Sequence, residues 1–196
     1  LQPGSSREDD LMGAIERLLH RVGRRARDLG RLAVSIGPGG FTGVRIAVAT
    51  AKAISEATGA GVVGVPTADG VIQSVDAEIR GRGAVIVCLA WKRADVWRSV
   101  YRPGVTRAEG SLVTLERLTE GVDGGAMFVM DGRLEERLRS QGGLPVGARV
   151  EKPRFDPVAL AVASLEIPDT DPLALAPLYP REPEAVTKWR ELGRGR

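Results

Sequence analysis

The sequence predicts an α/β fold that is divided into two lobes. In the first 81 residues, segments of helical periodicity alternate with short apolar runs, in the order helix, strand, helix, strand, helix. Two longer apolar runs follow the glycines Gly81 and Gly83 and are joined by a polar turn, which is typical of a β-hairpin. We therefore place a first lobe at 1–81, a smaller second lobe at 82–167 and an extended, proline-rich tail at 168–196.

The first lobe opens with an amphipathic helix. Its apolar residues recur at spacings of three and four and so share one helical face: Leu11, Ile15, Leu18, Leu19, Val22, Ala26 and Leu29. The polar stretch at 5–10 leads into this helix, and Gly30 ends it. The remaining elements that we expect here are strands at 31–36 and 62–65 and helices at about 42–58 and 67–78.

The second lobe is expected to be built around the hairpin. The strands that we expect are at 84–90, 96–102, 105–112, 126–130 and 148–150, and the helices are at 114–119, 134–139 and 157–165. Cys88 is the only cysteine and lies inside the first of these apolar runs. We therefore interpret it as a small core residue and not as a nucleophile or half of a disulfide.

Charge and hydropathy indicate where the protein is located and which kinds of partner it can have. The net charge is +3, and six arginines lie between Arg17 and Arg31 against one acidic residue, Asp28. This cluster is either a basic face that contacts nucleic acid or an ordinary solvated helix face. The sequence contains no apolar run of about 18 residues and no pattern of a secretory signal, so we expect a cytoplasmic protein with no membrane partner.

A glycine-rich loop joins the strand at 31–36 to the helix that follows. It contains Gly37, Gly39, Gly40, Thr42, Gly43 and Arg45. Such a loop can present backbone amides to a phosphate, but it matches neither the Walker A nor the Rossmann pattern. The alternative is a structural turn in which Pro38 stiffens the chain, Thr42 caps the helix and Gly43 permits close helix packing. The residues alone leave both interpretations open.

The helix after the glycine loop is rich in alanine between 46 and 54. Small side chains let partner helices approach closely. Together with the apolar stripe of the first helix, this composition indicates either a surface shared with another chain or ordinary packing inside the lobe.

The loop and this helix resemble the signature of the TsaB (YeaZ) family. The matching segments are Gly37 to Ile46, Ala47 to Ala57, Val62 to Thr67, Val85 to Tyr101, Met130 to Gly132, and Pro177 to Ala185 with Trp189. The resemblance implies the two-lobed fold of actin, Hsp70 and sugar kinases (ASKHA). Members of the family begin with three strands, the first of which carries an Asp-Thr-Ser turn. The resemblance therefore implies a first lobe without these strands and with an unpaired edge at 32–36.

The resemblance also implies a function. It implies a non-catalytic scaffold subunit that pairs with a TsaD-like paralogue, which transfers threonylcarbamoyl to adenosine 37 of tRNA. A TsaE-like ATPase docks on the pair, tRNA is reached through the complex, and a homodimer is possible. We expect no catalytic residue, cofactor or metal, because a TsaD-like metal site needs two histidines and this chain has only His20. The alternative is a kinase or ATPase that binds a nucleotide at the glycine loop.

The expected partner interface lies on the first helix and on the alanine-rich helix. We assign to it Leu11, Ile15, Leu18, Leu19, Val22, Val44, Ala47, Val48, Ala51 and Ile54. Two residues of the hairpin depart from the family pattern, since Leu89 stands where we expect Asp and Trp97 stands where we expect Tyr.

Overall fold

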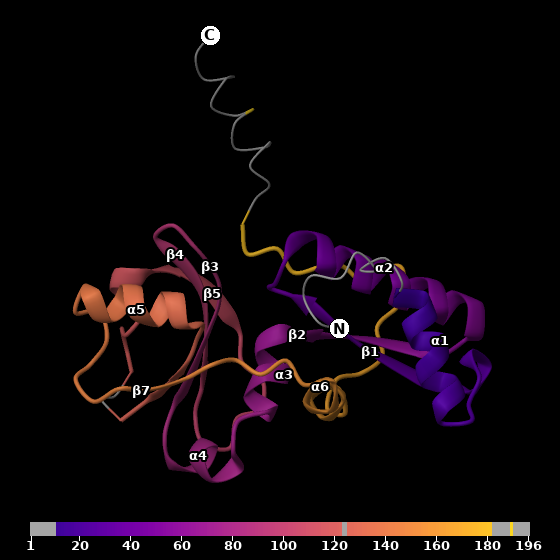
Figure 1. Cartoon of the computed structure of the whole chain (residues 1–196), viewed down its shortest axis with the longest axis horizontal. Helices are drawn as coiled ribbons and strands as arrows, with labels where there is room; N and C mark the ends of the chain where they lie inside the picture. Colours follow the sequence, from indigo (N-terminus) through magenta and orange to yellow (C-terminus); the bar gives the residue numbers. More distant parts are fainter. Residues whose placement is uncertain (1–10, 123–124, 182–188, 190–196) are drawn as a thin grey trace.

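The computed structural model describes residues 11–122, 125–181 and 189, and it places a β-sheet in each of two lobes (Figure 1). In the first lobe, β1 (Arg31–Gly37) and β2 (Gly61–Pro66) pair in parallel. In the second lobe the strand order is β5-β4-β3-β6-β7. These strands are β3 (Val85–Lys92), β4 (Asp95–Tyr101), β5 (Gly110–Thr114), β6 (Met127–Val129) and β7 (Arg149–Glu151).

Six α-helices flank the sheets in the described part of the chain. They are α1 (Leu11–Arg21), α2 (Phe41–Thr58), α3 (Thr67–Gln73), α4 (Ala77–Arg82), α5 (Gly132–Ser140) and α6 (Pro157–Ser164). Two short 3₁₀ turns, η1 (Ala26–Asp28) and η2 (Leu115–Arg117), complete the set. None of these helices is long and apolar enough to cross a membrane.

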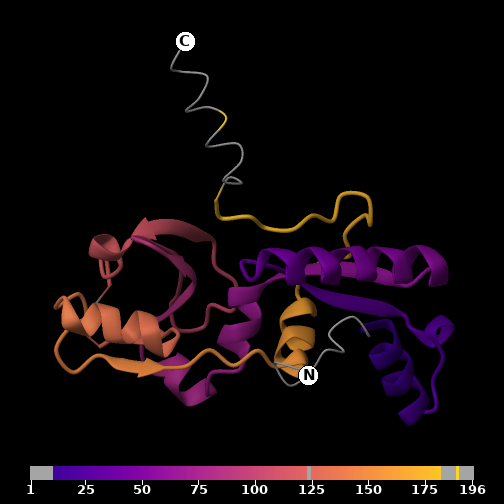
Figure 2. The same cartoon turned by 45° about the horizontal axis from the view of Figure 1, so that its top comes forward.

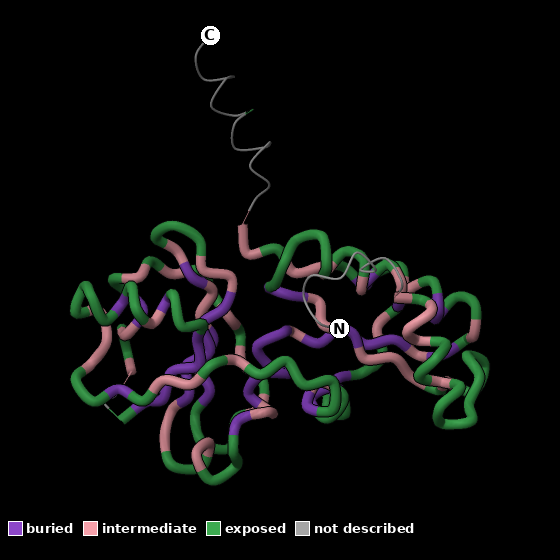
Figure 3. Tube along the Cα trace, viewed as in Figure 1, coloured by how far each residue is buried: buried purple, intermediate pink, exposed green. Residues whose placement is uncertain are grey.

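The sheet of the first lobe is covered on both faces. Figure 2 shows α2 along one face of β1 and β2 and α6 against the other. Because side chains alternate along a strand, Val62 points to α2 and packs with Val48, whereas Val63 points to α6 and packs with Ala163. Figure 3 shows that the buried residues follow the strands of both lobes and the helix between them.

The helix α3 connects the two lobes through its packing. Val71 and Ile72 are fully buried against Val87 and Val129 of the second sheet. On its other side α3 lies against α6, and Gly70 makes room for Leu160, because a Cβ at position 70 would lie 2.9 Å from a methyl group of that leucine.

The opposite face of the second sheet packs on α5. Phe128 and Leu134 belong to this core, together with Cys88. Cys88 is buried, as predicted, and burial raises the pKa of its thiol to about 12. The thiol therefore stays protonated and inert at neutral pH.

The predicted lobe boundary at 167 is wrong for α6. We grouped this helix with the second lobe because it follows β7 in sequence. In the structure Leu160 and Ala163 pack on Val63 and Val65, so α6 covers the sheet of the first lobe. The residues that our 82–167 boundary put together are therefore split between the lobes.

The start of the predicted tail is part of the first lobe. The amide of Thr170 donates a hydrogen bond to the carbonyl of Val62 (2.7 Å), and the amide of Leu178 donates to Ile36 (2.7 Å). Leu175 enters the core beside Gly64, where a Cβ would lie 2.7 Å from its methyl group. The stretch is interrupted by a turn, in which the amides of Ala174 (2.9 Å) and Leu175 (3.0 Å) donate to the Asp171 carbonyl. Residues 182–188 and 190–196 lie outside the described residues.

Several predicted elements end elsewhere. The first helix ends at Arg21 and not near 29, because the chain turns at Gly23, whose φ is +66°. The predicted helix at 67–78 is two helices, since Asp76 caps a new start through a hydrogen bond from the Glu78 amide (2.7 Å). The hairpin of β3 and β4 is present as predicted. The polar stretch at 5–10 lies outside the described residues.

Candidate functional site

The apolar stripe of α1 is not part of the core. No residue of this helix is buried. Leu18 is 60% exposed and Val22, just beyond the helix, is 62% exposed. Leu11, Ile15 and Leu19 are only half-buried. The predicted residues of this helix therefore form an apolar surface on the described part of the chain.

The α2 residues that we predicted in the partner interface differ from those of α1, because most of them belong to the protein's own core. For these residues the prediction is wrong. Val48, Ala51 and Ile54 are buried, and the first two pack on the sheet of their own lobe. Val44 and Ala47 lie against the same core. These residues recur every three or four positions, so they share the helical face that the sheet covers. Val44, Ala47, Val48 and Ala51 hold α2 on its own sheet and are not free to contact a partner, whereas Ile54 lines a groove beside α1.

The opposite side of α2 is exposed and carries small or apolar side chains. Its members are Ile46, Ala49, Ala53 and Ala57, which we call the outer α2 face. Ile46 is 49% exposed. Sequence reasoning missed this face because alanines lie all around the helix. The signal that could have found it is the position of the larger Val44, Val48 and Ile54, which marks the buried side.

The glycine loop is a structural turn whose first half is covered by the tail. Gly37 and Pro38 are buried, whereas Gly39 and Gly40 are exposed. Gly37 has a φ of +110°, and a Cβ there would lie 2.8 Å from the Leu178 carbonyl oxygen. Only glycine fits this position.

The capping and packing roles that we considered for the loop are not observed. Gly40 is the N-cap of α2, and no side chain caps the helix there, so Thr42 does not perform this role. A Cβ at Gly43 would meet nothing within 4 Å, so no neighbouring element needs this glycine. Both residues lie exposed in the first turn of α2, next to the outer α2 face.

An aromatic stack joins the start of α2 to the tail. The rings of Phe41 and Tyr179 are 5.3 Å apart. The Arg45 guanidinium carbon lies 4.8 Å from the centre of the Phe41 ring, which is the geometry of a cation–π contact. Phe41 is still 52% exposed. The stack therefore extends the exposed surface of α2 towards the tail.

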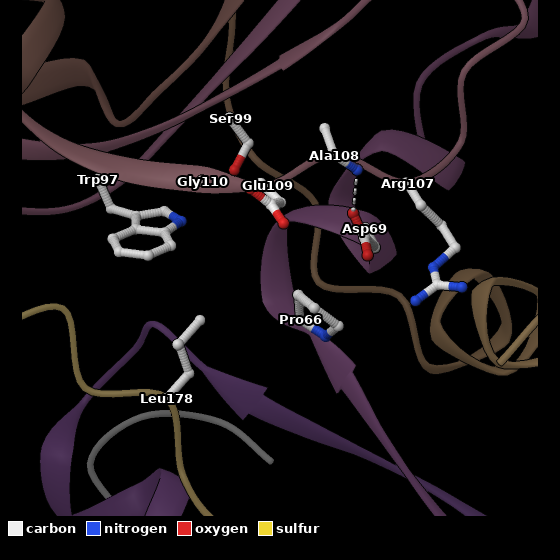
Figure 4. Close-up of a pocket in the computed structure, with 9 residues that line it drawn as sticks. All are labelled: Pro66, Asp69, Trp97, Ser99, Arg107, Ala108, Glu109, Gly110 and Leu178. Carbon is white, nitrogen blue, oxygen red and sulfur yellow. Dashed lines mark hydrogen bonds between the residues drawn. The ribbon is translucent and has the colours of Figure 1, made fainter. Parts of the chain in front are cut away.

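A pocket of about 440 Å³ lies between the lobes (Figure 4). It is lined by Pro66, Asp69, Trp97, Ser99, Arg107, Ala108, Glu109, Gly110 and Leu178. Trp97 covers Gly110, where a Cβ would collide with the indole nitrogen, while Leu89 is buried in the core beside α3. The glycine loop does not line this pocket. Arg181 of the tail donates hydrogen bonds to the carbonyls of Ala90 (2.8 Å) and Asp95 (2.7 Å) and so ties the tail to the β3–β4 hairpin.

Asp69 is the buried carboxyl group of this pocket. Its Oδ1 accepts hydrogen bonds from the Tyr101 hydroxyl (2.6 Å) and from the Ala108 amide (3.3 Å). Burial raises the pKa of Asp69, and these two hydrogen bonds and the charge of Arg107 oppose the shift. Burial, together with the Asp69 charge, also raises the pKa of Tyr101. The pair joins α3 to β4 and so fixes one lobe against the other.

The raised pKa of Asp69 has a consequence for stability. The folded protein holds this proton more tightly than the unfolded chain, whose Asp titrates near 3.8. The contribution of Asp69 to the free energy of unfolding is therefore full below pH 3.8 and is lost as the pH rises through the folded-state pKa. We expect Asp69→Asn, which keeps an oxygen acceptor, to make stability less dependent on pH in this range.

Urea unfolding from pH 4 to 8 checks this expectation. The difference in unfolding free energy between Asp69→Asn and the wild type should grow in favour of the variant as the pH rises. Asp171→Asn is the control, because this carboxylate is exposed on the tail. A constant difference for Asp69→Asn would contradict the raised pKa.

Solved structures share this fold. An uncharacterised protein with similarity to peptidase YEAZ from Pseudomonas aeruginosa matches with a TM-score of 0.72 and 18% identity, covering 92% of each chain. YeaZ from Pseudomonas aeruginosa matches with a TM-score of 0.70 and 16% identity, covering 89% of this chain and 85% of that chain. The molecule is thus a mixed α/β protein with the fold of the YeaZ structures.

Sequence comparisons give two further matches. The family model described as TsaD, tRNA N6-adenosine threonylcarbamoyltransferase, matches residues 6–97. Uncharacterized protein ML0378 of Mycobacterium leprae (strain TN) is 32% identical over 158 residues, which are 81% of this chain and 40% of that protein. The chain thus spans less than half the length of this relative. The solved structures therefore show the fold of this chain, and the TsaD family model matches slightly less than half of it.

Proposed function

We propose that this chain is the scaffold subunit of a machinery that forms N6-threonylcarbamoyladenosine on tRNA, and that it binds a TsaD-like catalytic protein. The observation that carries the proposal is the apolar surface of α1 and the outer α2 face. A helix whose apolar stripe contributes no buried residue gains little stability from its own chain and is suited to burial against another. The interface is made by Leu11, Ile15, Leu18, Leu19, Val22 and the outer α2 face.

The binding surface is apolar and helical, which favours a helical partner. Alanines at positions 49, 53 and 57 permit close approach of a second helix, and Ile46 and Leu18 supply larger groups for packing. A paralogue of the same fold would carry helices in the equivalent place. A second copy of the chain is the competing occupant, and a TsaE-like ATPase would join the pair at a separate surface.

A nucleotide-dependent kinase or ATPase is less well supported by the pocket. Asp69 and Glu109 line it, and their carboxylates would face the phosphates of a nucleotide. The glycine loop does not line this pocket, and the tail covers its first half. We therefore propose a subunit that performs no chemical step of its own and acts in the cytoplasm on tRNA through its partner.

Reconstitution tests the proposed function. The chain, its TsaD-like partner, a TsaE-like ATPase, tRNA and threonylcarbamoyl-adenylate are combined, and the modified nucleoside is measured by mass spectrometry of digested tRNA. We expect modification in the full mixture and a loss of at least about tenfold when this chain is omitted. Equal modification without the chain would refute the proposal. Modification by this chain without the TsaD-like protein would assign the catalysis to it.

A further inference from the structure

A groove of about 460 Å³ lies beside α1, between this helix and the segment 24–29. Its apolar lining includes Met12, Ile15 and Leu19 of α1, with Leu29 and the buried Ile54 of α2. The three α1 residues belong to none of the core clusters of the described chain. The groove is therefore an apolar cavity with room for a side chain of another molecule.

The rim of the groove is basic. His20, Arg24 and Arg25 line it, and Glu16 is the acidic residue among them. Arg24 and Arg25 take part in none of the ion pairs among the described residues. Asp28 lies close by, but its carboxylate accepts a hydrogen bond from the Arg25 amide (2.8 Å) and is engaged with the backbone. The exposed Arg21 and Arg27 add to the same charge.

The apolar lining, which forms the floor of the groove, and its basic rim together favour one kind of ligand. A nucleic-acid phosphate would pair with the arginines but would leave the apolar floor unfilled. A purely apolar segment would fill the floor but would leave the guanidinium groups without a counter-charge. A protein segment with apolar residues on one face and carboxylates beside them satisfies both.

We infer that this groove receives an acidic amphipathic segment, most simply a helix, of the catalytic partner. This inference rests on the proposed function and deepens it, because it assigns a charge to the partner surface that meets α1. The apolar contacts of the floor supply the affinity, and the arginines of the rim set the orientation and accelerate the encounter.

The first test is titration of the purified TsaD-like partner into the whole chain at 50 and 500 mM salt. We expect Arg24→Gln combined with Arg25→Gln to weaken binding about fivefold at low salt, and less at high salt because the charges are screened. Arg133→Gln combined with Arg137→Gln is the control, since these exposed arginines lie on α5 in the other lobe. It should bind like the wild type.

The outcomes separate the two claims. If the partner binds the wild type and the Arg24/Arg25 variant equally at low salt, the acidic segment is refuted while the proposed scaffold role stands. If the variant binds the partner normally but retains less tRNA in the complex, the basic rim belongs to RNA and the inference is overturned.

A second test does not require the partner. A designed helical peptide with leucines on one face and flanking glutamates is titrated into the chain, next to the same peptide with lysines in place of the glutamates. We expect binding of the acidic peptide only, and weaker binding to the Arg24/Arg25 variant. Equal binding of both peptides would overturn the inference, even if the partner protein fails to bind.

Discussion

Ala49→Glu combined with Ala53→Glu is expected to weaken binding of the TsaD-like partner by at least about 100-fold, while the isolated chain keeps its stability. Both alanines are exposed on the outer α2 face, so glutamates there remain in water when the chain is alone. In the complex the carboxylates would be buried against an apolar partner surface without counter-charges, which costs about 3–5 kcal/mol. Titration calorimetry with the purified partner measures the change.

Two further variants of the same kind make this result specific. Ala161→Glu places the same side chain on an exposed position of α6, and we expect it to leave the affinity unchanged. Ala51→Glu lies on the buried side of α2 and should destabilise the fold itself. If the Ala49/Ala53 variant binds the partner as tightly as Ala161→Glu does, the outer α2 face is not the interface.

The second large effect concerns stability. Phe128→Ala is expected to lower the free energy of unfolding by about 3–5 kcal/mol, because the ring is 1% exposed in the core of the second lobe and its loss leaves a cavity. Leu18→Ala should change it by less than about 0.5 kcal/mol, since this leucine is 60% exposed on α1. Urea unfolding of both variants gives the comparison.

This pair of variants tests whether the α1 stripe serves the chain's own core. Leu118→Ala is a matched control for Leu18→Ala, because Leu118 is fully buried. It should cost about 2–5 kcal/mol. A loss of similar size for Leu18→Ala would show that α1 is packed inside the isolated protein, and its apolar surface would then not be available to a partner.

The local pattern of apolar residues and turns predicted most of the helices and strands. The hairpin of β3 and β4, the existence of the strands β1 and β2 and the burial of Cys88 follow from runs of apolar residues and the turns between them. Asp76 is the sequence signal for the break between α3 and α4, because an aspartate that caps a new helix also interrupts the one before it. These features are determined by residues that are close in sequence, so they can be predicted from the sequence alone.

The assignment of α6 and of the outer α2 face could not be obtained in this way. A helix that follows the last strand of one lobe can return to the other, and only the contacts of Leu160 and Ala163 with the first sheet decide it. In α2, alanine fits both a buried and an exposed face, so periodicity alone did not separate Ala51 from Ala49. Tertiary packing decides both questions.

The pocket between the lobes was also beyond sequence reasoning. Asp69, Tyr101 and Ala108 come from three different segments, and their contact exists because α3 packs on the sheet of the second lobe. The residue type of Asp69 does not indicate that its side chain is buried. Its neighbours Ala68, Val71 and Ile72 do, since they place position 69 in a helix that is buried nearly all around.

Hydrogen–deuterium exchange of the chain, alone and with its TsaD-like partner, tests the central claim most directly. We expect the partner to slow exchange in α1 and in the exposed turns of α2, and to leave the strands β4 and β5 and helix α5 unchanged. Protection confined to the second lobe, with α1 exchanging as fast in the mixture as in the free chain, would contradict the claim that α1 and the outer α2 face bind the catalytic partner.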